Sequence, residues 1–258
     1  MALEEVLLRR AGGGKSPPTV RFFAWRPPAL SVGVGQRVER DVDLAALAGA
    51  GVDLVRRPSG GRAVLHDREL TYSVACPESL LPGGIEGSYR RLSRGLAEGL
   101  RRLGLEAELA PPRREEGRGR VSSCFATTSV FELVVGGRKV VGSAQRRAGG
   151  AVLQHGSVLL RYEPEAIGRF LRGQAAGGGG GEGNAAGIEQ VLARRVGFAE
   201  LALALREGLS AALGAELEPG ELTREEGEEA ERLAEEKYRS PAWNLRGEWS
   251  AARSLRAP

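Results

Sequence analysis

The sequence predicts a fold that combines helices with a central meander of antiparallel strands and ends in a helical C-terminal part. Between residues 130 and 160, segments with a two-residue period surround the turn Gly136-Gly137, which is a strong hairpin signal. Beyond Glu163 the apolar residues recur with the longer period of helices. The chain has 258 residues, 41% of them hydrophobic, so it can bury a full core as one large domain or as one domain with a small appendage.

The first half of the chain alternates between short helices and strands. Arg26-Pro27-Pro28 separates the first two strands, and Gly51 closes a short helix. We expect helices over residues 2–10, Asp43–Ala50 and Gly87–Leu103, and strands over Thr19–Ala24, Leu30–Val34, Val52–Arg56, Ala63–His66 and Leu70–Ala75. Pro111–Arg120 is polar and rich in arginine, so we expect a mobile loop there.

In the second half, Val130–Val135 and Arg138–Gln145 flank the Gly-Gly turn, and Ala151–Leu160 is a third strand. The two-residue period places Lys139, Val141, Ser143 and Gln145 on one face of their strand, and His155 and Ser157 on a common face of theirs. Helices are then expected over Glu165–Leu171, Ile188–Arg194, Phe198–Leu213 and Thr223–Tyr238.

The change in pattern divides the chain into a core, 1–163, and a helical C-terminal part, 164–258, which belongs to the same domain or forms a small subdomain. The glycine-rich stretch within 174–187 can hardly hold one conformation. It is not a phosphate loop, because it lacks both the Lys-Ser/Thr ending and a preceding strand.

Composition narrows the function classes. No apolar run of about 18 residues is present to span a membrane, and the N-terminus lacks a signal peptide's basic start, so we expect a cytoplasmic protein with Cys76 and Cys124 as free thiols. The net charge of +4 points to acidic partners. Nucleic acid is disfavoured, because aromatic residues make up only 5% of the chain and do not interleave with the arginines. A solvated arginine-rich surface remains an alternative explanation of the charge.

Lys139 and Cys124 are the first candidate catalytic residues. Only three of the 37 Lys and Arg residues are lysines, and a lysine ammonium, unlike a guanidinium, can change its pKa and pass a proton. Cys124 lies among small polar residues just before the Lys139 hairpin, whereas Cys76 ends an apolar strand and is expected to be buried. A nearby ammonium would favour the thiolate, which is the nucleophilic form. An isolated cysteine is more often an inert small hydrophobe.

The second candidate is the segment from Arg56 to Asp67. Adjacent glycines let a ligand approach the backbone, and the flanking arginines can hold an anion or a carbonyl-rich group. A hairpin with an exposed basic rim is the structural alternative, and His66 alone is more often a hydrogen-bonded structural residue. The residues concerned are Arg57, Ser59, Gly60, Gly61, Arg62 and His66.

These motifs resemble the biotin/lipoate ligase and octanoyltransferase superfamily. The resemblance rests on the segments 56–67, 69–73 (Glu-Leu-Thr-Tyr-Ser), Cys124-Phe125, 132–145 and 153–157 in this order, and it extends to both ends of the chain. The cysteine at position 124 is typical of the LipM-type branch, the octanoyl-[acyl-carrier-protein]:protein N-octanoyltransferases. ATP-dependent lipoate ligases generally have no nucleophile there.

The resemblance implies an α/β (α+β) fold with a mixed, mostly antiparallel sheet flanked by helices, and an acyltransferase that needs no cofactor or metal. It implies that Cys124 takes the acyl group of octanoyl-acyl carrier protein as a thioester, and that Lys139 lowers the pKa of this cysteine and orients the acyl carbonyl. Segment 57–66, with Gly142, Ser143 and Ala144, and with His155 and Gly156, would line the acyl pocket.

The resemblance further implies that a lysine of an apo lipoyl domain, either in the E2 subunit of a 2-oxoacid dehydrogenase or in the glycine cleavage H protein, then takes the acyl group as an amide. We expect a monomer that binds neither nucleic acid nor membrane. An ATP-dependent lipoate ligase, an octanoyl amidotransferase between lipoyl domains and a non-catalytic protein that binds acidic partners are the alternatives.

Two features depart from the family. Members usually carry a strand before the helix at residues 2–10, so we expect either that translation starts upstream of Met1 or that the sheet lacks an edge strand. The glycine-rich insert within 174–187 is also unlike the family norm, which leaves the C-terminal boundaries open.

Overall fold

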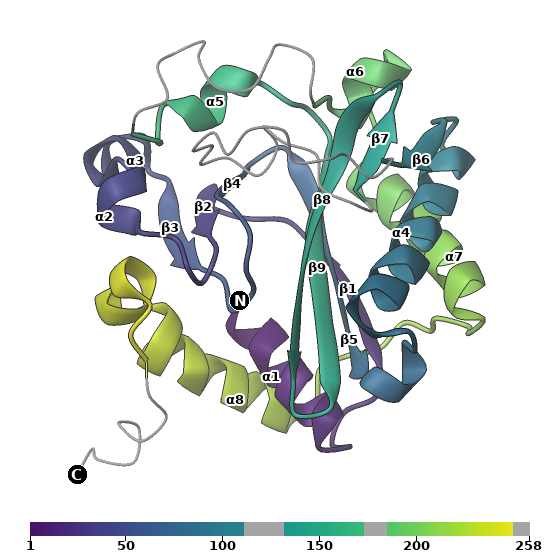
Figure 1. Cartoon of the computed structure of the whole chain (residues 1–258), viewed down its shortest axis with the longest axis horizontal. Helices are drawn as coiled ribbons and strands as arrows, with labels where there is room; N and C mark the ends of the chain where they lie inside the picture. The colour runs from purple at the N-terminus through teal and green to yellow at the C-terminus, as the bar shows by residue number, and fades with distance from the viewer. Residues whose placement is uncertain (111–131, 173–184, 250–258) are drawn as a thin grey trace.

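A six-stranded antiparallel sheet forms the centre of the computed structural model, which describes residues 1–110, 132–172 and 185–249 (Figure 1). Its strand order is β1-β5-β9-β8-β7-β6, with every neighbouring pair antiparallel. The strands are β1 (Thr19–Phe23), β5 (Glu69–Pro77), β9 (Ala151–Leu159), β8 (Arg138–Ala148), β7 (Leu133–Val135) and β6 (Ala107–Leu109).

A second sheet of three strands lies beside it in the order β3-β2-β4. Strand β2 (Ala29–Val32) pairs in parallel with β3 (Asp53–Arg56) and antiparallel with β4 (Val64–His66). The two sheets together confirm the predicted fold class, with a mixed, mostly antiparallel strand arrangement flanked by helices.

The turn between β7 and β8 confirms the predicted hairpin. Gly136 and Gly137 have φ angles of 55° and 72°, a left-handed conformation that favours glycine. A bulge between Leu133 and Val134 shifts the register of this strand pair, so Lys139 lies opposite Val134.

Helices α4 (Gly84–Arg102) and α7 (Phe198–Leu213) cover one face of the large sheet (Figure 1). Their leucines pack with Tyr72 and Val74 of β5 in the main core. Glycines let the two helices meet backbone to backbone, because a Cβ on Gly208 would lie 2.2 Å from the carbonyl oxygen of Gly95. Helix α7 is therefore part of the main core.

The opposite face carries α1 (Ala2–Gly12), which packs through Leu7 and Leu8 against Ala75 of β5 and Leu153 of β9. Helix α8 (Arg224–Leu233) packs against α1. The second sheet has its own small core with the short helices α2 (Val38–Asp41), α3 (Leu44–Ala50) and α5 (Pro164–Gly168). The remaining short helices are η1 (Glu78–Leu80) and α6 (Ile188–Leu192).

Most predicted elements occur within a few residues of their expected bounds, and the clearest difference lies at the C-terminus. The helix expected over 223–238 is α-helical only to Leu233 and continues as the π-helical turn η3 (Ala234–Tyr238), followed by a second π-helical turn, η4 (Ala242–Arg246). On η3, Lys237 and Tyr238 reach the carboxylate of Glu5 on α1, with Nζ 2.6 Å and the phenol oxygen 2.5 Å from Oε2.

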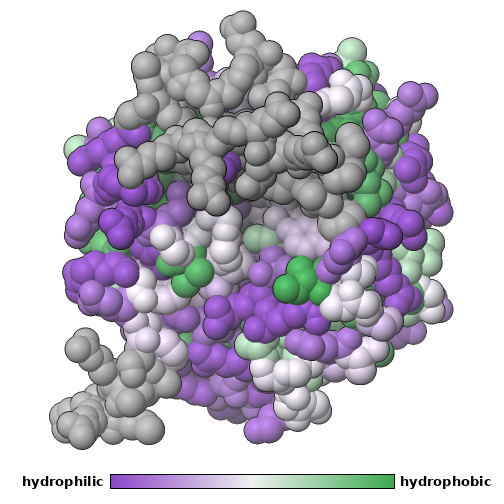
Figure 2. Space-filling view, viewed as in Figure 1, coloured by the Kyte–Doolittle hydropathy of each residue, from purple (hydrophilic) through white to green (hydrophobic). Residues whose placement is uncertain are grey.

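Two segments for which no fixed structure was expected, Pro111–Arg120 and nearly all of Gln174–Gly187, lie outside the described residues. No helix in the described ranges is long and apolar enough to cross a membrane. The face of the molecule in Figure 2 is mainly hydrophilic, with small separate hydrophobic spots. The exposed large hydrophobic residues of the described chain are likewise scattered over several elements: Val34, Leu80, Ile85, Phe198, Leu203 and Leu222.

Candidate active site

A cavity lies where the loop between β3 and β4 meets β8 and β9. Eight residues of the predicted substrate pocket line it: Arg57, Gly61, His66, Gly142, Ser143, Ala144, His155 and Gly156. Met1, Val64, Thr71 and Ser157 complete the lining. The structure therefore brings together motifs that are up to about a hundred positions apart in the sequence.

Arg57 shapes the glycine loop at one side of this cavity. Its Nη1 donates to the backbone oxygen of Ser31 at 3.0 Å, and its Nη2 donates to the carbonyls of Gly60 at 3.2 Å and Arg62 at 2.8 Å. These bonds hold the loop that contains Gly60 and Gly61 in a tight curve. Gly33 beneath it must be glycine, since a Cβ there would lie 2.1 Å from the carbonyl oxygen of Gly61.

Arg56 begins the predicted segment but was not among the predicted site residues, and it joins the turn after β2 to η4. Its side chain donates five hydrogen bonds to backbone carbonyls, three in the turn after β2 and two in η4, and only 1% of the residue is exposed. The indole nitrogen of Trp243 in turn donates a hydrogen bond to the backbone oxygen of Arg56 at 3.0 Å. A planar guanidinium suits this task because its donors spread in fixed directions.

His66 lies in a chain of buried polar groups. Its Nε2 is 2.6 Å from the hydroxyl of Ser31, and its Nδ1 is 2.7 Å from a carboxylate oxygen of Glu69. Because Arg57 already donates to the Ser31 hydroxyl at 2.6 Å, the Ser31 hydrogen is assigned to His66 Nε2, and Nδ1 of the neutral ring carries the proton that Glu69 accepts. Trp25 stacks on the imidazole with ring centres 4.4 Å apart.

His155 repeats this arrangement on the neighbouring strand. Its Nε2 is 2.5 Å from the hydroxyl of Ser59, and its Nδ1 is 3.5 Å from a carboxylate oxygen of Glu4 on α1. Glu4 has no solvent exposure. Burial alone raises the pKa of Glu4. The nearby His155, the Met1 amino group and Arg21 have the larger effect and lower this pKa to about 2.

Lys139 is completely buried, and Nζ donates to Oε1 of Glu132 at 2.5 Å. Glu132 is 5% exposed and precedes β7, so the hairpin joins the two residues across the strand pair. The sequence singled out the lysine but gave Glu132 no role. Each ion would be costly to bury alone, so the pair explains how a charged lysine can lie in the core.

Tyr72 links the cavity to the interior of the sheet. Its hydroxyl is 2.7 Å from that of Ser143 and accepts a bond from Nε2 of Gln154 at 3.0 Å, so its hydrogen is assigned to Ser143. Burial raises the pKa of Tyr72 to about 12, although its hydrogen bonds with Ser143 and Gln154 act in the opposite direction. Gly156 makes room for this ring, because a Cβ there would lie 2.8 Å from it.

The two cysteines were expected to differ, and Cys76 is indeed a buried free thiol. Burial raises its pKa to about 11, although Arg147 nearby acts in the opposite direction. A thiol of this kind is a poor nucleophile at neutral pH. Cys124, the predicted nucleophile, lies outside the described residues.

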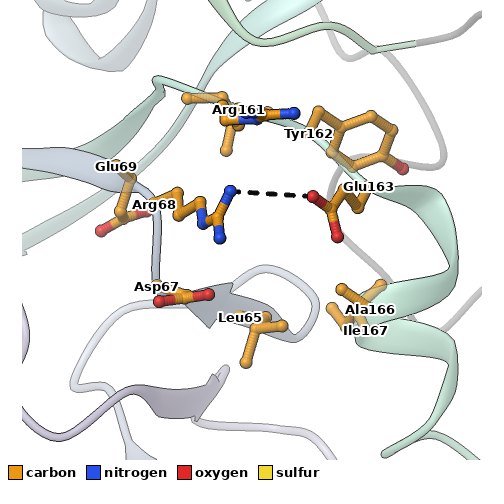
Figure 3. A pocket seen from close by; sticks show the side chains of 10 residues that line it. Leu65, Asp67, Arg68, Glu69, Arg161, Tyr162, Glu163, Ala166 and Ile167 are labelled. Atoms are coloured by element: carbon orange, nitrogen blue, oxygen red, sulfur yellow. Dashed lines mark ion pairs between the residues drawn. The ribbon is translucent and has the colours of Figure 1, made fainter.

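A second cavity lies between the β4–β5 turn and the segment that leads from β9 into α5 (Figure 3). Arg68 and Glu163 face each other across it at 3.9 Å, but both side chains are more than half exposed, so this ion pair contributes little. Glu69 is part of its wall while also bonding His66 of the first cavity. The sequence gave no signal for this cavity.

Solved structures with this architecture include lipoate-protein ligases. A crystal structure of lipoate-protein ligase A bound with ATP aligns with a TM-score of 0.77 and 25% identity, and covers 95% of this chain and 92% of that one. A T. acidophilum structure, described as a lipoate protein ligase with bound lipoic acid, aligns with a TM-score of 0.75 and 23% identity, over 96% and 95% of the two chains. The fold is thus that of the lipoate-protein ligases.

Sequence relatives are closer. The octanoyltransferase LipM of Kyrpidia tusciae is 46% identical over 258 aligned residues, covering 95% of this chain and 93% of the relative. The octanoyltransferase LipM of Bacillus subtilis is 41% identical with the same coverage. The model of the lipoyl protein ligase A/B catalytic domain matches residues 1–210. The chain therefore belongs to the lipoyl protein ligase A/B catalytic domain family, on the branch of relatives named octanoyltransferase LipM.

Proposed function

We propose that this protein is an acyltransferase that moves an octanoyl group onto a lysine of lipoyl-domain proteins, a step of lipoate biosynthesis. The main support is the 46% identity to an octanoyltransferase LipM over nearly the whole chain. The proposed donor is octanoyl-acyl carrier protein. The acceptors are apo lipoyl domains of 2-oxoacid dehydrogenase E2 subunits or the glycine cleavage H protein, and the compartment is the cytoplasm.

The lining of the first cavity fits an acyl chain with a polar carbonyl end. Gly61, Gly142, Ala144 and Gly156 present small surfaces to it, while Ser143 and the two histidines supply a few fixed polar groups. Such a combination of an apolar wall and a few placed hydrogen-bonding groups is typical of small-molecule sites. We assign the acyl chain to this cavity.

The transfer would proceed through a thioester on Cys124. The thiolate of Cys124 attacks the carbonyl carbon of the donor thioester, a bond from this carbon to Sγ forms, and the carrier's thiolate leaves and takes up a proton. The amine of the acceptor lysine then attacks the same carbon, the bond to Sγ breaks, and one proton is released as the amide forms. The ammonium of Lys139 would favour the thiolate and orient the carbonyl.

Acyl labelling tests this proposal. Incubation with octanoyl-acyl carrier protein should add one octanoyl group, seen by intact mass spectrometry and removed by neutral hydroxylamine. The variant Cys124→Ser should lose the hydroxylamine-sensitive label. Cys76→Ser is the matched control and should label normally, because burial raises the pKa of the Cys76 thiol to about 11. A wild-type protein that remains unlabelled would overturn the proposed reaction.

The two alternative activities predict different results in this labelling experiment. A lipoate ligase would require ATP and free lipoate, and its activity would survive Cys124→Ser. An amidotransferase would form the same thioester, but from an octanoylated lipoyl domain rather than from the carrier protein. Comparing the two octanoyl donors therefore separates these reactions.

A further inference from the structure

The only two histidines of the chain line the same cavity, and each lies between a buried serine and a buried glutamate. Ser31, His66 and Glu69 form one chain, and Ser59, His155 and Glu4 form the other. The first is fixed by close hydrogen bonds along its whole length. In the second chain, the contact between the histidine and the carboxylate is longer, with Nδ1 of His155 3.5 Å from an oxygen of Glu4.

Neither oxygen of Glu4 has a hydrogen-bond partner in the described part of the chain, and both are buried. The His155 Nδ1 contact at 3.5 Å is an ion-pair distance rather than a close hydrogen bond. A buried carboxylate without donors is strongly destabilising unless a positive charge can form beside it. Glu4 is therefore suited to stabilise an imidazolium at His155.

The proton positions follow from this geometry. With Glu4 facing Nδ1, the ring tautomer that avoids two opposed lone pairs has its hydrogen on Nδ1. Nε2 is then the acceptor of the Ser59 hydroxyl hydrogen across 2.5 Å. Ser59 is buried directly behind the cavity wall: its hydroxyl contacts His155, and it is two residues before Gly61, both of which line the cavity.

We propose that Glu4 is a positioning residue for His155, and that Ser59 and His155 take up the proton released when the acceptor lysine attacks the enzyme thioester. This inference rests on the proposed function. In the step, the amine nitrogen bonds to the carbonyl carbon and the bond to Sγ of Cys124 breaks. The nitrogen passes one proton to Oγ of Ser59, whose own hydrogen moves to Nε2 of His155. The imidazolium beside Glu4 later returns its proton to solvent.

The charged groups around Glu4 come from four elements. His155 faces it from β9, and Arg21 acts on it from β1. The amino group of Met1 is 3.7 Å from it, and the phenol of Tyr238 on η3, whose pKa burial raises, also lies within its electrostatic reach. Of these groups, His155 and Met1 line the cavity, and only His155 also contacts Ser59.

Separate measurement of the two half-reactions tests the proposal. We expect Glu4→Gln to acylate from octanoyl-acyl carrier protein at a rate within about twofold of wild type, and to transfer octanoyl from the isolated acyl-enzyme to a lipoyl domain about tenfold or more slowly. Glu4→Asp keeps the charge and should recover part of the transfer rate. Ser59→Ala should also slow transfer selectively.

Glu5→Gln is the matched control, because Glu5 is the next residue of the same helix and is a buried carboxylate with its own cationic partner. We expect this variant to be less stable but to keep the wild-type ratio of the two rates. Equal losses in both half-reactions for Glu4→Gln, or an unchanged transfer rate, would overturn the inference and leave Glu4 a structural residue of α1.

A second readout does not need activity. Two histidines give a simple ¹⁵N imidazole spectrum, assigned with His66→Gln, in which His155 should show the Nδ1-protonated tautomer. In Glu4→Gln the preference of His155 for this tautomer should be lost, because Nδ1 no longer faces a carboxylate, while the signals of His66 remain unchanged. An unchanged His155 spectrum would contradict the role of Glu4 even if labelling of Cys124 succeeds. A wild-type protein without labelling would instead refute the proposed function.

Discussion

Lys237 offers a direct measure of how the C-terminal turns are held to the core. Its Nζ lies 2.6 Å from Glu5 Oε2, and both side chains are less than a tenth exposed. The ring centres of Trp243 and Trp249 are 4.0 and 4.6 Å from the same nitrogen. The change Lys237→Met keeps most of the side-chain volume while removing the charge.

The expected loss of stability follows from the groups left behind. Removing one partner of a buried ion pair costs about 3–5 kcal/mol, because the other charge remains buried. Glu5 keeps a hydrogen bond from Tyr238 and an ion pair with the half-exposed Arg9, so we expect the lower end, about 3 kcal/mol. Urea unfolding of wild type and variant, followed by circular dichroism, measures the difference.

A double-mutant cycle separates the ion pair from lost packing. If Glu5→Gln is combined with Lys237→Met, no charge is left unpaired, so the double variant should be more stable than the sum of the single losses predicts, by at least about 1 kcal/mol. Additive losses would refute the coupling.

The pH dependence gives an independent check. Burial alone raises the pKa of Glu5, but hydrogen bonds from Lys237 and Tyr238 outweigh it and lower the pKa below 4.5. On the acid side, the stabilisation by the pair is therefore complete above this pH, and the difference between wild type and Lys237→Met should shrink as the pH falls below it. Burial lowers the pKa of Lys237, so the same difference should also shrink at alkaline pH.

Three further variants probe the cavity and its supports. Gly156→Ala would place a Cβ 2.4 Å from the carbonyl oxygen of Gly142. Thermal unfolding should therefore show a loss of stability of about 1–3 kcal/mol, and acyl labelling should decrease. A variant with wild-type stability and full labelling would contradict this packing. Arg56→Lys retains the charge but not the planar set of donors, and should lower the free energy of unfolding in urea by about 2 kcal/mol or more. An unchanged unfolding midpoint would contradict the anchoring role of Arg56. Tyr72→Phe removes the hydrogen bond to Ser143 and should lower stability by about 1 kcal/mol, while a larger effect on labelling than on stability would assign Ser143 to substrate contact.

Local patterns made much of the fold and part of the site predictable. The Gly-Gly hairpin needs left-handed residues, and the long helix and the central strands carry clear periods, so they were found near their observed positions. The π-helical turns at the C-terminus were missed because their widening depends on contacts with α1, and not on the local sequence. Both histidines were among the predicted site residues because their motifs resemble the family, and both line the cavity, His66 from the end of β4 and His155 from the middle of β9.

The glutamates that serve the site could not be identified in this way. Glu4, Glu69 and Glu132 look in the sequence like ordinary helix or strand residues, and their burial exists only once the sheet has formed. Glu4 meets His155 because α1 packs across β5 and β9, which no spacing along the chain reveals. Buried carboxylates become visible only through their tertiary partners.

Buried arginines and buried lysines have different structural roles in this protein. Arg56 and Arg57 bind several backbone carbonyls at once, for which a planar fork of donors is suited. The two buried lysines, Lys139 and Lys237, each pair with one glutamate at 2.5 and 2.6 Å, for which a compact ammonium is suited. The third lysine, Lys15, is exposed. In an arginine-rich chain, lysine thus remains where a point charge must fit into the core. The ammonium of Lys139 already pairs with Glu132, so a thiolate stabilised by this ammonium would share it with the Glu132 carboxylate.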